Sequence, residues 1–207
     1  MSKIRHLQDA ACRQTIESLC DFVLPETESG SDELQSADYS IHAVDLRQLP
    51  DTLPWLNTEV PTLIVSECCL IYLSPSEADN VLQTFSRWFT RSQLAVVIYE
   101  PIRPNDAFGK TMIRNLVSRG IYLQTLEKYA DLEKQESRFT ELGLSGRALD
   151  IDTIWRRWID EAEKERIDKL EWMDEVEEFV LLAKHYCISW GWRDGPDDSP
   201  WRALTAS

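Results

Sequence analysis

Two apolar runs joined by an amphipathic helix place the strongest constraint on how this chain can fold. Residues 61–73 (PTLIVSECCLIYL) and 94–100 (LAVVIYE) are almost continuously apolar. Strands that are covered on both faces, as in parallel sheets, have runs of this kind, whereas half-solvated strands alternate. Residues 74–77 (SPSE) form a capping-box pattern with proline at the first helical position, and apolar residues at helical spacing follow. A strand, a helix and a strand with short joints indicate a right-handed crossover unit with parallel strands.

The remainder of the chain continues this alternation of strands and helices. Further helices are predicted over residues 3–23, 105–120, 130–143, 153–172 and 174–186, and short strands over 39–46, 147–151 and 187–192. Residues 26–38 (ETESGSDELQSAD) are acidic, serine-rich and nearly free of apolar side chains, which predicts a surface loop. The whole pattern indicates an α/β fold with a mostly parallel sheet and helices on both faces.

The charge balance excludes several classes of partner. Lys and Arg total 22 and Asp and Glu total 36, which gives a formal net charge of −14. Nucleic-acid binding needs clustered positive charge, and an anionic membrane surface repels an acidic protein. The chain has no apolar stretch of membrane-spanning length, and its start (MSKIRHLQDA) is not a signal peptide. We therefore expect a cytoplasmic protein that binds neither nucleic acid nor membranes.

The cysteines and histidines lack the spacing of a metal site or a disulfide framework. Their positions are Cys12, Cys20, Cys68, Cys69, Cys187, His6, His42 and His185. Five cysteines without a CxxC pair indicate reduced thiols, and the histidines are expected to be structural, so no metal site is predicted. The motifs GxGxxG, HExxH and GxSxG are also absent, which argues against zinc proteases and serine hydrolases.

Polar side chains follow the predicted strands, where ligands bind in open α/β sheets. They are Asp45 with Leu46, Glu67 with Cys68 and Tyr72, and Tyr99 with Glu100. A carboxylate just past a strand end can accept hydrogen bonds from ribose hydroxyls or from the exocyclic amine of a purine. Glu67 stands inside an apolar run, where an ionised carboxylate is costly to bury without a partner. Two interpretations stay open for it, a ligand contact or an ion pair with an internal arginine.

Four segments of the chain resemble the eukaryotic leucine carboxyl methyltransferases. They are VDLRQLP (44–50), PTLIVSECCLIYLSPSEADNVL (61–82), YEPIRPNDAFGKTMIRNL (99–116) and LEWMDEVEEFVLLAKHYCISWGW (170–192). Their order and spacing make the resemblance specific, and it covers most of the chain from about residue 40 to residue 193. It implies an S-adenosylmethionine-dependent methyltransferase (Rossmann-like) fold. It also implies methyl esterification of the α-carboxylate of the C-terminal leucine of the protein phosphatase 2A catalytic subunit.

The resemblance assigns roles to four residues at the strand ends. Asp45 and Leu46 would flank the adenine of S-adenosyl-L-methionine, and Glu67 would lie beside the same cofactor. Tyr72 would line the channel through which the leucine carboxylate enters. The implied reaction is an in-line displacement at the sulfonium methyl group. It depends on alignment and desolvation more than on a general base, because a carboxylate is already ionised at pH 7.

The family's N-terminal half has no counterpart in this sequence. The resemblance implies a substrate-binding arginine, a glycine-rich first turn and an acidic residue after the second strand, and none is found here. We therefore expect residues 1–193 to form a partial methyltransferase domain with unpaired sheet edges, and residues 194–207 to be a loose tail. Three interpretations stay open: a family member incapable of catalysis alone, an enzyme completed by another chain, and a non-catalytic protein that binds the phosphatase.

Overall fold

The computed structural model describes residues 33–35, 39–170 and 173–193 in two compact units. The smaller unit ends at Leu49 and the larger begins at Pro50. The helix predicted over residues 3–23 and the tail predicted over residues 194–207 lie outside the described residues. The prediction that residues 1–193 form one domain therefore stays a prediction.

The smaller unit corrects two predictions about its secondary structure. Strand β1 (Glu33–Gln35) falls within the stretch that was predicted to be a loop, and it pairs antiparallel with β2 (Ser40–His42). A three-residue strand held by backbone pairing leaves no apolar periodicity in the sequence. The strand predicted over residues 39–46 also ends early, because the Asp45 side chain accepts a hydrogen bond from the Arg47 backbone amide and starts the short 3-10 helix η1 (Leu46–Gln48).

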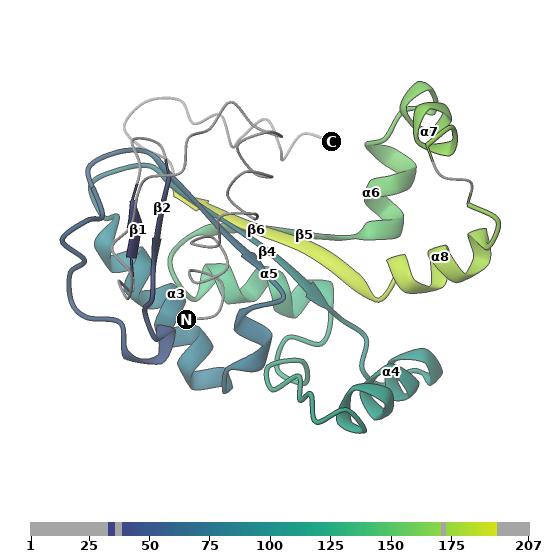
Figure 1. Ribbon diagram of the computed structural model, residues 1–207, viewed down its shortest axis with the longest axis horizontal. Coiled ribbons are helices and arrows are strands. Elements are labelled where there is room, and N and C mark those ends of the chain that lie inside the picture. The colour runs from purple at the N-terminus through teal and green to yellow at the C-terminus, as the bar shows by residue number, and fades with distance from the viewer. Residues whose placement is uncertain (1–32, 36–38, 171–172, 194–207) are drawn as a thin grey trace. The chain divides into compact units, whose positions relative to one another are not determined.

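The larger unit contains a four-stranded sheet with the strand order β3-β4-β6-β5 (Figure 1). Its strands are β3 (Thr62–Glu67), β4 (Leu94–Pro101), β5 (Ser145–Asp150) and β6 (Tyr186–Arg193). Strand β3 pairs parallel with β4, and β6 pairs antiparallel with both β4 and β5. Three strands therefore run in one direction and only β6 runs against them, which confirms the predicted α/β fold with a mostly parallel sheet.

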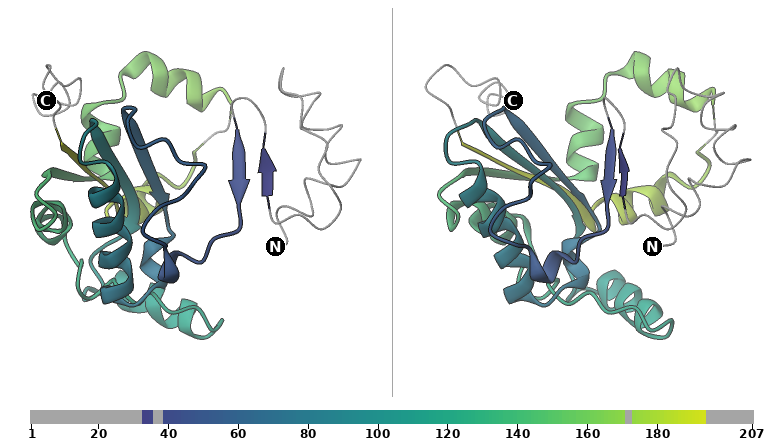
Figure 2. Two further views of the ribbon diagram at one scale, coloured as in Figure 1. Left: turned by 90° about the vertical axis from the view of Figure 1, so that its left-hand side faces the viewer. Right: turned by 60° about the vertical axis from the view of Figure 1, so that its left-hand side comes forward.

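One face of this sheet is closely covered by helices α3 (Pro75–Trp88) and α5 (Leu132–Thr140) (Figure 2). Helix α3 begins with the predicted capping box, in which the Ser74 side chain and the Glu77 side chain each bond the other's backbone amide. Helix α5 places Phe139 so close to Gly191 that a Cβ there would lie 2.3 Å from its ring. The absence of a side chain at Gly191 thus lets α5 pack directly on the sheet.

The opposite face is covered only in part, which corrects the prediction for β3. Its Leu63 and Val65 side chains are 49% and 67% exposed, although their sequence is typical of a strand covered on both faces. Helix α6 (Ile151–Arg157) reaches this face at β6, where Trp158, just after the helix, lies edge-on to Trp190 with ring centroids 5.7 Å apart. Helices therefore lie on both faces, but within the described residues β3 is an edge strand with one open face.

The remaining α-helices among the described residues are α4 (Ala107–Val117), α7 (Glu161–Asp168) and α8 (Val176–Ala183). The single helix predicted over residues 153–172 is wrong. It is divided after α6 because the Asp160 side chain accepts a hydrogen bond from the Glu163 backbone amide and starts α7. In the described part of the chain, no helix combines the length and the apolar character needed to cross a membrane.

Candidate functional site

The carboxyl ends of the parallel strands β3 and β4 meet at one edge of the sheet. Glu67 and Tyr99 are partners in the register of the two strands, so their side chains point to the same face. The next backbone amide, of Cys68, donates a hydrogen bond to the Tyr99 carbonyl at 2.9 Å. Cys68 then adopts a φ of +42° and turns the chain into the 3-10 helix η2 (Leu70–Tyr72). The structure therefore brings the predicted residues Glu67 and Tyr72 to the same edge.

Glu67 is exposed, which rejects one of the two interpretations that the sequence left open. It takes part in none of the ion pairs found among the described residues, so it does not pair with an internal arginine. The buried carboxylate is Glu100 at the end of β4, whose Oε2 accepts a hydrogen bond from Arg138 Nη1 at 3.0 Å. Burial raises the pKa of Glu100, and the Arg138 guanidinium acts in the opposite direction. The internal ion pair thus exists, one strand away from its predicted position.

A polar network connects this ion pair to helix α3. The Arg138 guanidinium lies over the ring of Tyr129, 4.2 Å from its centroid. The Tyr129 hydroxyl donates a hydrogen bond to Asp79 of α3, which also accepts one from Lys128. Burial, the largest cause, and the hydrogen bond to Asp79 raise the pKa of Tyr129 to about 12. These contacts join residues that are far apart in sequence, and no local pattern indicated them.

The segment that contains Lys128 and Tyr129 also holds the turn that carries Tyr72. The Gln124 side chain donates a hydrogen bond to the Tyr72 carbonyl at 2.5 Å, and the Gln124 backbone amide donates one to the Ile71 carbonyl at 2.8 Å. The carbonyls of Ile71 and Tyr72 are therefore both fixed from outside the turn. The Tyr72 side chain itself is 46% exposed and points away from the core. Its backbone is held while its ring is accessible to a ligand.

Tyr99 has an aromatic neighbour that the sequence did not indicate. Its ring stacks on the ring of Tyr186, at the start of β6, with a centroid distance of 5.3 Å and an interplanar angle of 19°. Burial is the largest cause that raises the pKa of both phenols. The negative charge of Glu67 raises the pKa of Tyr99 further, and an ionised Tyr72 would act on Tyr186 in the same direction. Four polar or aromatic side chains thus gather at this edge.

Asp45 and Leu46 lie in the smaller unit. Asp45 was predicted to follow the end of a strand, but it is the cap of η1. Its carboxylate accepts hydrogen bonds from Arg47 Nε at 2.9 Å and from Arg47 Nη2 at 2.7 Å. The Arg47 side chain, which is the largest cause, lowers the pKa of Asp45 to about 2. Asp45 is therefore ionised at neutral pH, and both of its oxygens accept hydrogen bonds from Arg47. The juxtaposition of Asp45 with Glu67 stays a prediction.

The histidine in the larger unit has a structural role. His185 is buried, and its Nδ1 lies 2.7 Å from the Leu181 carbonyl oxygen, while its Nε2 lies 2.8 Å from Asp106 Oδ2. Both ring nitrogens are therefore occupied. A search of the described residues for three or more His, Cys, Asp or Glu side chains that could hold a metal ion finds none.

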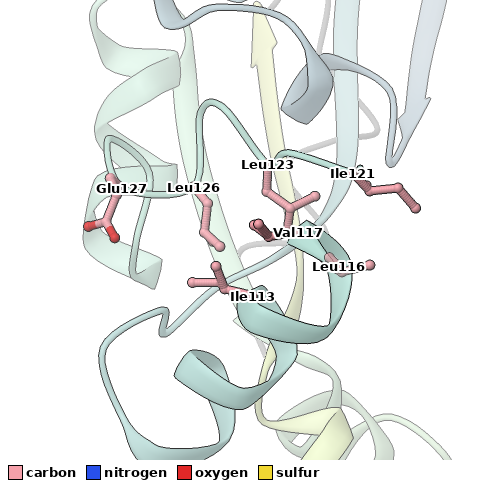
Figure 3. A pocket seen from close by; sticks show the side chains of 7 residues that line it. All are labelled: Ile113, Leu116, Val117, Ile121, Leu123, Leu126 and Glu127. Carbon is pink, nitrogen blue, oxygen red and sulfur yellow. The ribbon is translucent and has the colours of Figure 1, made fainter. Parts of the chain in front are cut away.

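A hollow beside α4 is a separate feature (Figure 3). Its volume is about 110 Å³. Its lining is apolar apart from one carboxylate, and consists of Ile113, Leu116, Val117, Ile121, Leu123, Leu126 and Glu127. Pockets for drug-sized ligands hold about 300–1,000 Å³ and include several convergent polar groups. This hollow is therefore not the site of a nucleoside-sized cofactor.

Curated relatives assign the chain to a family, although no family model matches it. Leucine carboxyl methyltransferase 1 of Emericella nidulans is 50% identical over 186 residues, which are 79% of this chain and 49% of that protein. The chain belongs to the leucine carboxyl methyltransferase family. The protein of the same name from Aspergillus fumigatus is 49% identical over 191 residues, with 79% of this chain and 48% of the relative covered. The one from Caenorhabditis elegans is 33% identical over 192 residues, which are 90% of this chain and 57% of that protein.

The family assignment confirms the resemblance seen in the sequence. The chain spans about half the length of the curated leucine carboxyl methyltransferases that it matches. Among solved structures, phosphoethanolamine N-methyltransferase 2 of Haemonchus contortus in complex with S-adenosyl-L-methionine aligns with a TM-score of 0.36 at 12% identity. That alignment covers 65% of this chain and 33% of the other. At this score the likeness adds nothing, and the fold assignment rests on the strand order and directions above.

Proposed function

We propose that the chain contributes the β3–β4 edge of an S-adenosylmethionine-dependent methyltransferase. The substrate in this proposal is the α-carboxylate of the C-terminal leucine of the protein phosphatase 2A catalytic subunit. The observation that carries it is Glu67, an exposed carboxylate at the end of β3, outside every ion pair of the described residues. It stands in a chain that is 50% identical to a leucine carboxyl methyltransferase.

The residues at this edge and in η1 fit S-adenosyl-L-methionine. A carboxylate has about four acceptor positions, and hydrogen bonds from Arg47 reach both oxygens of Asp45, so Asp45 would accept a ligand hydroxyl or amine in exchange for a contact with the exposed Arg47 side chain. Glu67 accepts from the ribose or the adenine in the same way, and Leu46 gives an apolar contact to the adenine. Bound S-adenosyl-L-methionine would supply an electrophilic methyl group. The residues of the chain bind and orient the cofactor and take no part in proton transfer.

Tyr72 fits a role in positioning the leucine carboxylate. The carboxylate is already ionised at neutral pH, so the protein has to align it and to exclude water. The hydrogen bonds from Gln124 hold the backbone of Tyr72, so its exposed ring projects from a fixed turn. His185, which is buried with both nitrogens occupied, is not available as a base.

A second candidate function is favoured by the open face of β3. Leu63 and Val65 lie exposed on a sheet face whose remaining strands are largely covered. A further polypeptide segment seated there would cover them, and the chain would then act as one part of a two-part enzyme or as a non-catalytic phosphatase-binding protein. This candidate predicts capture of the phosphatase without any dependence on cofactor.

Transfer of labelled methyl groups tests the proposal and separates the two candidates. The purified chain is incubated with S-adenosyl-L-methionine labelled in the methyl group and with the phosphatase catalytic subunit, either intact or lacking its terminal leucine. Label that appears only on the intact subunit supports the enzyme. Capture of the subunit without label supports the non-catalytic binder. If the subunit is neither labelled nor captured, both candidate functions are overturned.

A matched pair of variants tests the role of Glu67. Calorimetric titration of S-adenosyl-L-methionine is expected to show about 10- to 100-fold weaker binding for Glu67→Ala, the range for losing hydrogen bonds to a charged group. Glu59→Ala removes an exposed carboxylate before the start of β3 and is the control. Equal affinities for the two variants would overturn the assignment of Glu67.

A further inference from the structure

Three side chains at the β3–β4 edge form an unusual row across the sheet. Strand β4 lies between β3 and β6, so Tyr99 has Glu67 on one side and Tyr186 on the other. The stacked rings of Tyr99 and Tyr186 use one face of each ring for each other. The second face of Tyr99 is therefore turned toward the side of the carboxylate. All three side chains retain access to solvent.

This row has the chemistry of a cation site. The faces of aromatic rings carry negative electrostatic potential and attract cations, most strongly where water is partly excluded. Glu67 adds a full negative charge, and no Lys or Arg of the described residues forms an ion pair with it. A sulfonium or quaternary ammonium ion, with its charge spread over methyl groups, matches both the rings and the carboxylate.

We propose that the free face of Tyr99, whose other face stacks on Tyr186, forms with Glu67 a binding site for an alkyl-onium cation, and that this cation is the sulfonium centre of the cofactor. The identity of the cation rests on the proposed function, whereas the site itself rests on the geometry of the row. Tyr72, the residue proposed to contact the substrate, lies in the turn that directly follows β3 and its Glu67. The site thereby distinguishes the charged methyl donor from its neutral demethylated product.

The difference between donor and product provides the first test. S-adenosyl-L-methionine carries a sulfonium, and S-adenosyl-L-homocysteine carries a neutral thioether in nearly the same molecule. Tyr99→Leu is expected to weaken donor binding about 2- to 30-fold, the range of cation–π interactions, and product binding less than about twofold. Tyr99→Phe retains the ring and is the matched control, which is expected to bind both ligands like the wild type. Equal weakening of donor and product by Tyr99→Leu would mean a structural role and would overturn the proposal.

A second measurement separates this proposal from the proposed function. Trimethylsulfonium is titrated into the wild-type chain and followed by the NMR signals of the tyrosine rings, with neutral tert-butanol as the control of similar size. Binding of trimethylsulfonium that Tyr99→Leu weakens, without binding of S-adenosyl-L-methionine, supports the cation site and overturns its assignment to the cofactor. Donor binding that is insensitive to the ring retains the proposed function and overturns the cation site. If neither trimethylsulfonium nor S-adenosyl-L-methionine binds, both the cation site and the proposed function are overturned.

Fluorinated phenylalanine at position 99 guards against variants that fail to fold. Each added fluorine weakens the negative potential of the ring face while it changes the size of the ring little. Donor affinity is expected to fall stepwise with fluorine number, and product affinity is expected to stay constant. A flat series for the donor would overturn the proposal.

Discussion

Strands β3 and β4 are neighbours with similarly apolar sequences and very different surroundings. Strand β4 is flanked on both sides and is almost wholly buried, and Ile98 at its centre has no exposed surface. Strand β3 has a neighbour on one side only, and its Val65 is 67% exposed. The difference shows that an apolar run predicts a strand that needs cover on both faces, but does not identify what provides the cover. Substitutions in the two strands, in the helix between them and in the covering helix α5 test this difference.

The largest effect is expected from breaking the ion pair on the covered side. Arg138→Ala leaves the Glu100 carboxylate buried without its partner, which costs about 3–5 kcal/mol. Urea unfolding followed by tryptophan fluorescence measures the loss in the free energy of unfolding. Arg147→Ala, which removes an exposed arginine of β5, is the control and is expected to stay within about 0.5 kcal/mol of the wild type. Similar values for the two variants would contradict the assignment of the pair to the core.

Matched truncations in the two strands compare them directly. Ile98→Ala is expected to lower the free energy of unfolding by about 2–5 kcal/mol, because it leaves a cavity in the core. Val65→Ala removes exposed methyl groups and is expected to change it by less than about 0.5 kcal/mol. The same urea titrations measure both. A loss above 2 kcal/mol for Val65→Ala would show that the open face of β3 is covered in solution.

A smaller effect is expected at the helix that connects the two strands. Ser74→Ala removes the side-chain cap of α3 and is expected to cost about 1 kcal/mol. Thermal unfolding measures the change as a lower melting temperature. Ser76→Ala alters the next serine without removing the cap and should leave the melting temperature nearly unchanged. Equal effects from the two serines would argue against the capping box.

The smallest effect on stability, and the largest on association, is expected from Val65→Lys. A charge at this exposed position costs little in the folded chain but interrupts an apolar surface. Sedimentation velocity over a range of concentrations is expected to show association of the wild type that the lysine variant reduces. A wild-type chain that stays monomeric throughout would show that the open face is not adhesive.

How much could be predicted from sequence depended on whether the signal was local. The capping box at Ser74 and the strand–helix–strand unit were predictable, because neighbouring residues encode them. The partner of Arg138 was not, because the sequence shows two carboxylates at strand ends and only the packing of α5 selects Glu100. The break after α6 was missed because a run of charged residues hid the cap at Asp160. At the candidate site, strand-end position and family resemblance predicted Glu67 and Tyr72, and the structure places both at the same edge of the sheet. The stacking of Tyr186 on Tyr99 needed the register of β6.

The backbone of Cys68 has a consequence for which sequences can occupy this edge. A φ of +42° is accessible to glycine, asparagine and aspartate, but is strained for valine, isoleucine and threonine, whose branched Cβ crowds the backbone. Replacement of Cys68 by glycine should therefore be accepted by the fold, whereas isoleucine would force the chain out of its turn. Any such shift would move the whole turn and carry Tyr72 away from Glu67. A single torsion angle thus limits which substitutions this chain can accept between Glu67 and Tyr72, the residues proposed to contact the cofactor and the substrate.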